Sequence, residues 1–85
     1  MVEVLYTTVI IGDGPYYGMV PDFSLMASGS TRDAVNSELQ KLTDEAVAVA
    51  QRYGTAIPVA TAKNVLEAKW KGNYFFSSVV VRVKK

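Results

Sequence analysis

The chain has 85 residues, 49% of which are hydrophobic, and a formal net charge of +1. A chain of this length is expected to form a single domain over residues 1–85, and its composition excludes a disordered protein. It contains neither cysteine nor histidine, which excludes disulfides, thiolate or imidazole catalysis and most zinc sites. No apolar run approaches the ~18 residues that span a bilayer, and the lack of cysteine is compatible with the cytoplasm, where we expect the protein.

The first third of the chain predicts three strands. Residues 2–11 are rich in β-branched and aromatic side chains, which favours a strand. The cluster Gly12-Asp13-Gly14-Pro15 predicts a turn, and residues 16–20 then form the second arm of a hairpin. Because Pro21 cannot donate to a sheet ladder, that strand ends there or lies on an edge. Residues 25–28 predict a short third strand.

Residues 31–53 predict the longest element, an amphipathic helix. Ser30 is its expected N-cap, with Asp33 three residues later in a weak form of the capping box. Gly54 follows the helix in the usual C′ position, and Arg52 in the last turn complements the helix dipole. Apolar residues spaced by three and four predict one buried face, formed by Val35, Leu39, Leu42, Ala46, Val49 or Ala50, and Tyr53.

The last third of the chain predicts a short helix and a strand. Residues 61–69 form the expected helix, with Thr61 as its cap, and Gly72-Asn73 predicts a turn. Residues 74–83 then form a final strand. The fold class is therefore α+β, with a three-stranded antiparallel start, one long helix, a short second helix and a final strand, in the order β-β-β-α-β.

Apolar side chains occupy both faces of the first predicted strand. One long helix covers only one face of a small antiparallel sheet, and a solvated face normally carries polar residues. We therefore expect a partner on the second face or on an edge, as in a homo-oligomer (a dimer or a tetramer). The alternative is that the short second segment folds back over that face. The two sets are Val4, Tyr6 and Ile10 on one face and Leu5, Val9 and Ile11 on the other.

The residues do not assemble a recognisable catalytic or cofactor site. The Gly12-Asp13-Gly14 turn lacks the third glycine of a nucleotide-binding loop and leads into a strand, where that loop requires a helix N-terminus. The serines have no imidazole base to activate them, and no Ser–Lys motif is present. The carboxylates are scattered, whereas metal-assisted hydrolysis needs clustered oxygen ligands. We expect no enzymatic activity, no cofactor and no metal.

One stretch, residues 69–76, allows an alternative function in binding RNA or DNA. Basic side chains interleaved with aromatic ones suit phosphate contacts combined with base stacking. The contact residues would be Lys69, Trp70, Lys71 and Tyr74. The competing interpretation is that Trp70 and Phe75 belong to the core and the lysine stems lie over them.

The motifs at the first helix resemble those of the HicB-like antitoxin domain. That family has an aromatic residue, two variable residues, a valine and Pro-Asp, followed by a Gly-x-Thr-x-x-x-Ala helix start. The corresponding stretches here are Tyr17-Gly18-Met19-Val20-Pro21-Asp22 and Gly29-Ser30-Thr31 with Ala34 beyond it, one residue closer to the threonine than in the family pattern. The segment Gly54-Thr55-Ala56-Ile57-Pro58 is also similar to the one that follows the long helix in the family.

This resemblance implies a truncated RNase H-like fold and the antitoxin half of a toxin–antitoxin pair. The partner it implies is a HicA-type toxin, a small basic mRNA-cleaving protein whose catalytic histidine the antitoxin occludes. RNase H activity itself is not expected, because the chain lacks the acidic cluster. Phe23-Ser24-Leu25 replaces the Leu-Pro-Gly common in the family. Many members carry a C-terminal module for operator binding, and a chain ending at Lys85 leaves no room for one, so we do not expect autoregulation by direct DNA binding through such a module.

Asp22 and Phe23 are the residues that we expect to contact such a partner. Residues 1–62 carry three basic and seven acidic side chains, whereas residues 63–85 carry six basic and one acidic. An acidic surface suits an inhibitor of a basic nuclease, because complementary charge raises the association rate and the specificity. The alternative for Asp22 is a structural one, in which its carboxylate caps local N–H groups in the turn.

Overall fold

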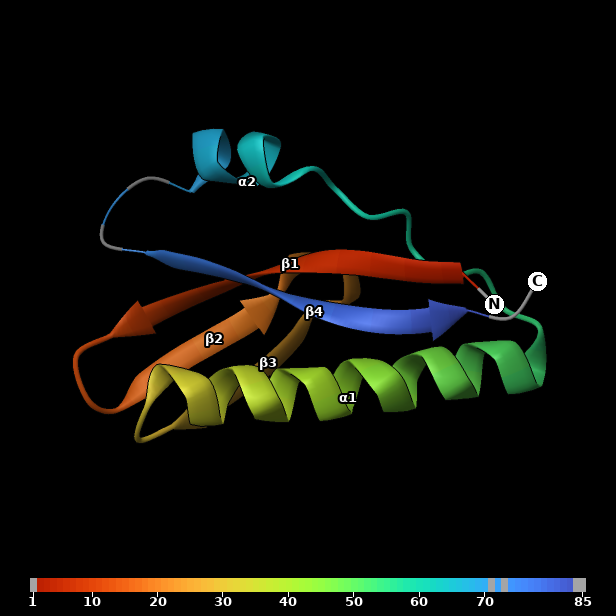
Figure 1. The fold of residues 1–85 in the computed structure, drawn as a ribbon, viewed down its shortest axis with the longest axis horizontal. Helices are drawn as coiled ribbons and strands as arrows, with labels where there is room; N and C mark the ends of the chain where they lie inside the picture. The colour runs from red at the N-terminus through yellow and green to blue at the C-terminus, as the bar shows by residue number, and fades with distance from the viewer. Residues whose placement is uncertain (1, 71, 73, 84–85) are drawn as a thin grey trace.

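The computed structural model describes residues 2–70, 72 and 74–83. The described chain is α+β, as the sequence predicted, and consists of a four-stranded antiparallel sheet, a long helix and a short second helix (Figure 1). The elements are β1 (Val2–Gly12), β2 (Tyr16–Val20), the 3-10 turn η1 (Pro21–Phe23), β3 (Leu25–Gly29), α1 (Arg32–Tyr53), α2 (Lys63–Lys69) and β4 (Phe75–Val83).

The strands lie in the order β3-β2-β1-β4, and every neighbouring pair is antiparallel. The first three strands form a meander, whereas β4 returns after both helices to pair with β1 along nine residues, from Val2↔Val83 to Ile10↔Phe75. The three registers run without a bulge. Side chains therefore alternate strictly between the two faces.

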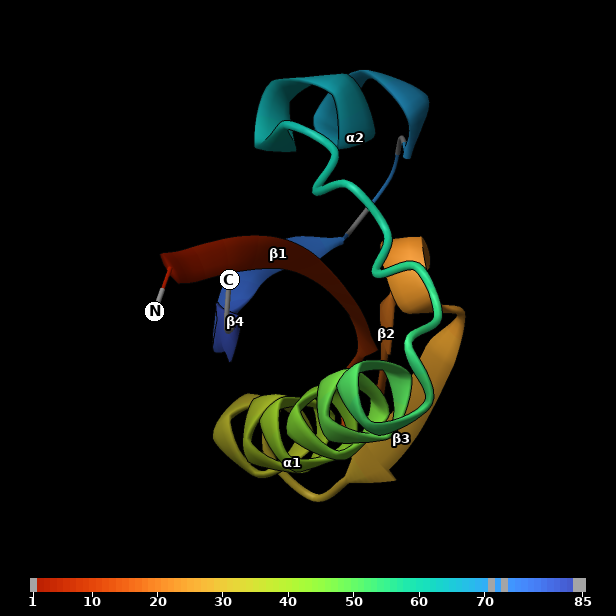
Figure 2. The ribbon, with the colours of Figure 1, turned by 90° about the vertical axis from the view of Figure 1, so that its right-hand side faces the viewer.

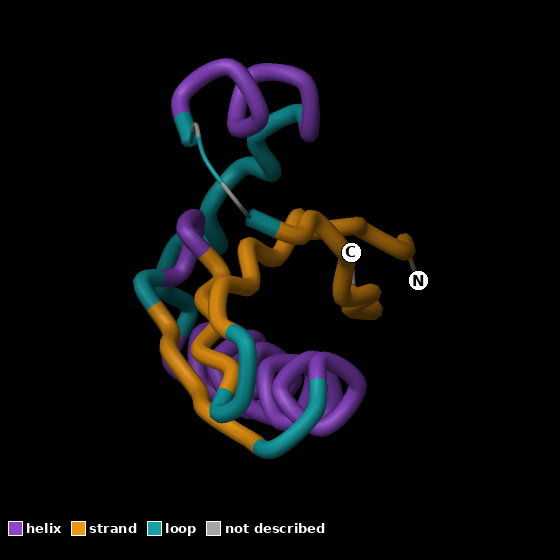
Figure 3. Tube along the Cα trace, turned by 90° about the vertical axis from the view of Figure 1, so that its left-hand side faces the viewer, coloured by secondary structure: helices purple, strands orange, loops and turns teal. Residues whose placement is uncertain are grey.

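The two helices lie on opposite sides of the sheet (Figures 2 and 3). The long helix α1 covers one face, where a buried cluster forms the core. The short α2 lies over the other face, on which Thr7 and Val9 are buried, and Leu66 is the buried residue of α2. The second segment thus folds back over the second face of the sheet, in part. The core cluster comprises Tyr6, Ile10, Val20, Val35, Leu39, Val47, Val79 and Val81.

Gly18 of β2 allows α1 to lie close to the sheet. A Cβ atom at this position would lie 2.5 Å from Val35 Cγ1, 3.1 Å from Leu39 Cδ1 and 3.2 Å from Ile10 Cγ1. Any side chain here would force Val35, or the helix that carries it, to shift, because real Cβ contacts are not that short and cores tolerate little extra volume.

The C-terminal end of α1 is as predicted from the sequence, whereas its N-terminal cap differs from the prediction. Gly54 ends the helix with φ 68°, in the left-handed conformation expected of a C′ glycine. The N-cap, however, is Thr31, whose hydroxyl accepts from the N–H of Ala34 at 3.0 Å. The prediction of Ser30 was wrong by one residue, because the helical backbone begins at Arg32.

The buried stripe of α1 also differs from the predicted one. Val35 and Leu39 are buried as expected, but the stripe continues through Thr43 and Val47. Tyr53, predicted to be buried, is 72% exposed, and Val49 is exposed as well. Thr43 can enter the core because its hydroxyl donates to the carbonyl of Leu39 at 2.6 Å, which satisfies the polar group.

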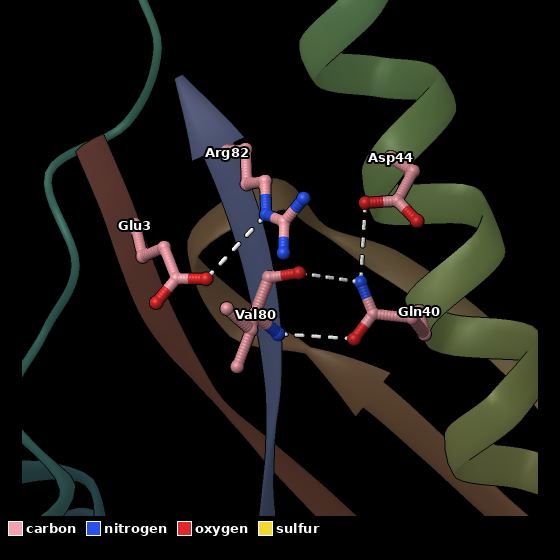
Figure 4. Close-up of polar contacts among 5 residues, drawn as sticks. All are labelled: Glu3, Gln40, Asp44, Val80 and Arg82. Carbon is pink, nitrogen blue, oxygen red and sulfur yellow. Dashed lines mark hydrogen bonds and ion pairs between the residues drawn. The ribbon is translucent and has the colours of Figure 1, made fainter. Parts of the chain in front are cut away.

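Side chains of α1 cover the middle of the outer edge of β4 (Figure 4). Gln40 donates to the carbonyl of Val80 at 2.7 Å and accepts from its N–H at 3.0 Å. One turn earlier, Asn36 donates to the carbonyl of Ser78 at 3.0 Å and accepts from the buried hydroxyl of Thr8 at 2.8 Å. The helix therefore supplies hydrogen bonds that another strand would otherwise make.

Candidate partner-binding surface

Asp22 makes a structural contact across the chain. It lies in η1, after the proline that ends β2, and its carboxylate accepts two hydrogen bonds from Thr61. These are from the backbone N–H at 3.0 Å and from the hydroxyl at 2.6 Å. The contact fixes the segment that leads from α1 to α2 against the end of β2. Thr61 consequently does not cap α2, which starts at Lys63 without a side-chain cap, so that prediction was wrong.

Phe23 and Tyr6 hold the same segment. Their rings pack edge to face with centroids 4.8 Å apart, and the buried Tyr6 hydroxyl donates to the carbonyl of Pro58 at 2.6 Å. Burial, with a smaller contribution from the negative charge of Asp22, raises the pKa of Tyr6 above its ordinary value.

Both predicted contact residues are thus half-buried and engaged within the chain. The carboxylate of Asp22 caps an N–H group, as the structural alternative supposed, but one that lies 39 residues further along the chain. Contact between Asp22 or Phe23 and another protein stays a prediction.

The second face of the sheet carries apolar side chains that α2 leaves uncovered. Leu5 is 59% exposed, and its cross-strand neighbour Val80 is exposed beside it. At the other end of the face, Tyr17 is 54% and Met26 71% exposed, and Ile11 pairs with Tyr17 across the strands. The sequence indicated this face through Leu5 and Ile11, but Tyr17 and Met26 join it only through the β1–β2 and β2–β3 registers.

The exposed residues near the β1–β2 hairpin border a small apolar hollow, which we call the apolar groove. Trp70 and Tyr74 close one side of it, with their rings edge to face and their centroids 5.5 Å apart. Its volume is about 90 Å³. The groove is lined by Val9, Ile11, Tyr17, Gly18, Met19, Met26, Trp70 and Tyr74.

The structure separates the residues of the proposed nucleic-acid stretch. Trp70 and Tyr74 are half-buried and line the apolar groove, while Lys69 is exposed at the end of α2. Lys71 lies outside the described residues. Phe75 is 42% exposed beneath the guanidinium of Arg32, which lies 4.1 Å from the ring centroid, so its assignment to the core was wrong. Two of the expected base-stacking rings thus pack on each other and on the sheet.

A larger hollow of about 540 Å³ lies where the N-terminus of α1 meets β4. Arg32, Asp33 and Asn36 line it together with Tyr16 and Phe75. Arg32 and Asp33 carry opposite charges, and Asn36 is already hydrogen-bonded to Thr8 and Ser78. Within residues 2–70, 72 and 74–83, no three His, Cys, Asp or Glu side chains gather in a way that would hold a metal ion.

Comparisons with known proteins leave the chain without an assigned family. No protein-family model matches it, and neither a curated protein nor a solved structure does. The part of the chain that is described contains no helix long and apolar enough to cross a membrane. The likeness to HicB-like antitoxins therefore rests on the motifs at residues 17–22 and 29–34 and on the order of the elements.

Proposed function

We propose that the protein is a non-catalytic, cytoplasmic antitoxin-like module that binds and occludes a small basic mRNA-cleaving toxin of the HicA type. The observation that carries the proposal is the apolar groove with its exposed rim on the second face. A contiguous exposed apolar patch on a protein is a common mark of a binding site. The order of the elements, with a Pro-Asp turn after β2 and a Gly-Ser-Thr start to α1, agrees with the resemblance.

The composition of the groove suits a protein partner. Tyrosine, tryptophan and methionine are enriched in interface cores, which charged residues avoid. Tyr17, Met26 and Trp70 supply all three types. Asp13 lies in the exposed turn between the two strands that carry Ile11 and Tyr17, and it provides an acidic rim for a basic partner.

Co-expression with a HicA-type toxin tests the proposal, with co-purification and rescue of growth as readouts. Tyr17→Ala should weaken the complex at least tenfold, because an aromatic anchor at the centre of an interface typically contributes more than about 1.4 kcal/mol. Tyr53→Ala is the matched control, since Tyr53 is exposed on α1, on the other side of the sheet. Equal affinity of the Tyr17 and Tyr53 variants would remove the groove from the interface.

The same experiment separates the roles of Asp22 and Phe23. Phe23→Ala should lower the stability of the free protein in either case, because Phe23 packs on Tyr6. If Phe23 also contacts the toxin, the complex is weakened under conditions in which the variant is fully folded. If Phe23 acts only within the chain, the folded variant binds the toxin as tightly as the natural protein.

RNA or DNA binding through Lys69, Trp70 and Tyr74, with Lys71, is the alternative function. It would appear as affinity for single-stranded RNA or DNA that falls steeply with salt. Co-elution with the toxin at fixed stoichiometry supports the antitoxin role instead.

We also propose that the protein forms a homo-oligomer, a dimer or a tetramer. The support is the set of apolar side chains on the second face that α2 leaves exposed, which includes Leu5, Val80 and Met26.

A further inference from the structure

The two edges of the sheet are treated differently. At the β4 edge, Gln40 of α1 satisfies the outward N–H and carbonyl of Val80 (Figure 4). Asn36 of α1 satisfies the carbonyl of Ser78. At the β3 edge, no hydrogen bond joins the outward backbone groups to any other described residue. An open edge presents a row of donors and acceptors to another strand.

The registers identify which backbone groups of β3 point outward. Val80 of β4 turns its N–H and carbonyl away from β1. Since these groups alternate along antiparallel strands, the pairings Gly18↔Ala27 and Val20↔Leu25 are the hydrogen-bonded ones between β2 and β3. The N–H and carbonyl groups of Met26 and Ser28 therefore point away from the sheet.

Three common protections of an edge strand, namely charge, proline and bulges, are missing at β3 among the described residues. Natural edges carry lysine, proline or bulges that prevent pairing. Residues 23–31 contain no charged side chain and no proline, and the β2–β3 register has no bulge. Met26, the second residue of β3, is 71% exposed and borders the apolar groove.

We propose that a second copy of this chain pairs with β3, antiparallel, about a two-fold axis at Ala27. In this register all five residues of each β3 overlap, with Met26 opposite Ser28 of the partner and Ala27 opposite Ala27. Met26 and Ser28 then exchange both backbone hydrogen bonds twice, as an antiparallel ladder requires. The edge is uncharged, so it does not repel its own copy and has no charge with which to select a basic or acidic strand. An isologous contact of this kind closes at a dimer.

The inference rests on the proposed self-association, for which it names the surface, and does not depend on the toxin. Pairing at β3 would join the two sheets into one, with a groove on each side of the joint, because Met26 of β3 borders the groove in each copy.

Ser28→Pro tests the edge in the full chain, because proline removes only an outward donor there and leaves the β2–β3 ladder intact. Light scattering after size exclusion should give twice the chain mass of 9.3 kDa for the natural protein and for Ser28→Ala. Ser28→Pro should give the single chain mass with an unchanged circular dichroism spectrum. A natural protein that remains monomeric at high concentration overturns the proposal, and so does a Ser28→Pro dimer.

A single cysteine provides a second measurement that does not depend on proline being tolerated. The chain has no cysteine of its own, and facing residues at a non-hydrogen-bonded antiparallel site have Cα atoms about 4.5 Å apart, within disulfide range. Ala27→Cys should form a covalent dimer on mild oxidation, whereas Ala48→Cys on the exposed side of α1 should not. Equal cross-linking of the two variants contradicts the assignment. If Ser28→Pro is monomeric and still binds the toxin, the edge and the proposed function are shown to be separate.

Discussion

Gln40 and Val80 form a two-way hydrogen bond between a helix side chain and the backbone of a strand (Figure 4). The amide group of Gln40 has a donor and an acceptor in one plane, as the peptide groups of a neighbouring strand have. Asp44 accepts the remaining N–H of that amide at 3.1 Å, which fixes its orientation. A side chain of α1 thus takes the place of a fifth strand beside β4.

Gln40→Leu should lower the free energy of unfolding by about 1–2 kcal/mol, because two hydrogen bonds of modest net value are lost. It should also promote aggregation on heating, since the β4 edge opens. Urea unfolding and light scattering measure the two effects. Lys41→Leu, at an exposed position of the same helix, is the control, and equal losses in both variants would refute a role for the amide.

Gly18→Ala should destabilise the protein by roughly 1–3 kcal/mol, as overpacking of a core does. The reason is the 2.5 Å approach of the added Cβ to Val35 Cγ1. Val35→Ala removes that methyl group, so the double variant should lose less stability than the two single variants together. Urea unfolding of all four proteins closes the cycle. Strict additivity would show that the helix does not meet the sheet at this glycine.

Stability should decline at alkaline pH through Tyr6. Its pKa is raised by burial and by Asp22, so the folded state favours the protonated phenol. This contribution is complete below the ordinary pKa of about 10 and is lost as the pH rises from there toward the raised pKa. The stability of the natural protein should therefore fall relative to Tyr6→Phe above that pH. A constant difference between the two across the range would contradict the prediction.

Asp22→Asn should loosen the segment before α2. An asparagine amide keeps only one acceptor for the N–H and hydroxyl of Thr61, which now meet both carboxylate oxygens. We expect amide exchange in α2 to accelerate about tenfold, equivalent to about 1.4 kcal/mol, while exchange in β1 and β4 is unchanged. The fluorescence of Trp70, the single tryptophan, reports the same release. Asp13→Asn in the exposed hairpin turn is the control and should behave as the natural protein.

The sequence predicted the elements where the signal is local. The strand and helix ranges, the Gly54 stop and the two-sided character of β1 follow from periodicity and turn chemistry. Thr31 and Ser30 are both good caps, and only the backbone geometry distinguishes them. The predicted stripe omits Thr43 because it contains apolar residues only, whereas the hydroxyl of Thr43 bonds back to the preceding turn and so can be buried.

The candidate surfaces were less predictable, because they join distant residues. The pairing of Asp22 with Thr61 spans 39 positions, and no local pattern announces it. Tyr17 and Met26 meet the groove only through strand registers, and Trp70 reaches it from beyond α2. The open and closed edges likewise depend on which strands lie outermost, which spacing along the chain does not determine.

The pairing of the first strand with the last has a consequence for the order of events during synthesis. β1 obtains its longest neighbour from residues 75–83, so a nascent chain on the ribosome holds an incomplete sheet until those residues have left the exit tunnel. Contacts of such long sequence separation form slowly, and until then the edge of β1 that faces β4 is open and prone to intermolecular association. The sheet is therefore expected to be completed late, only after β4 has emerged.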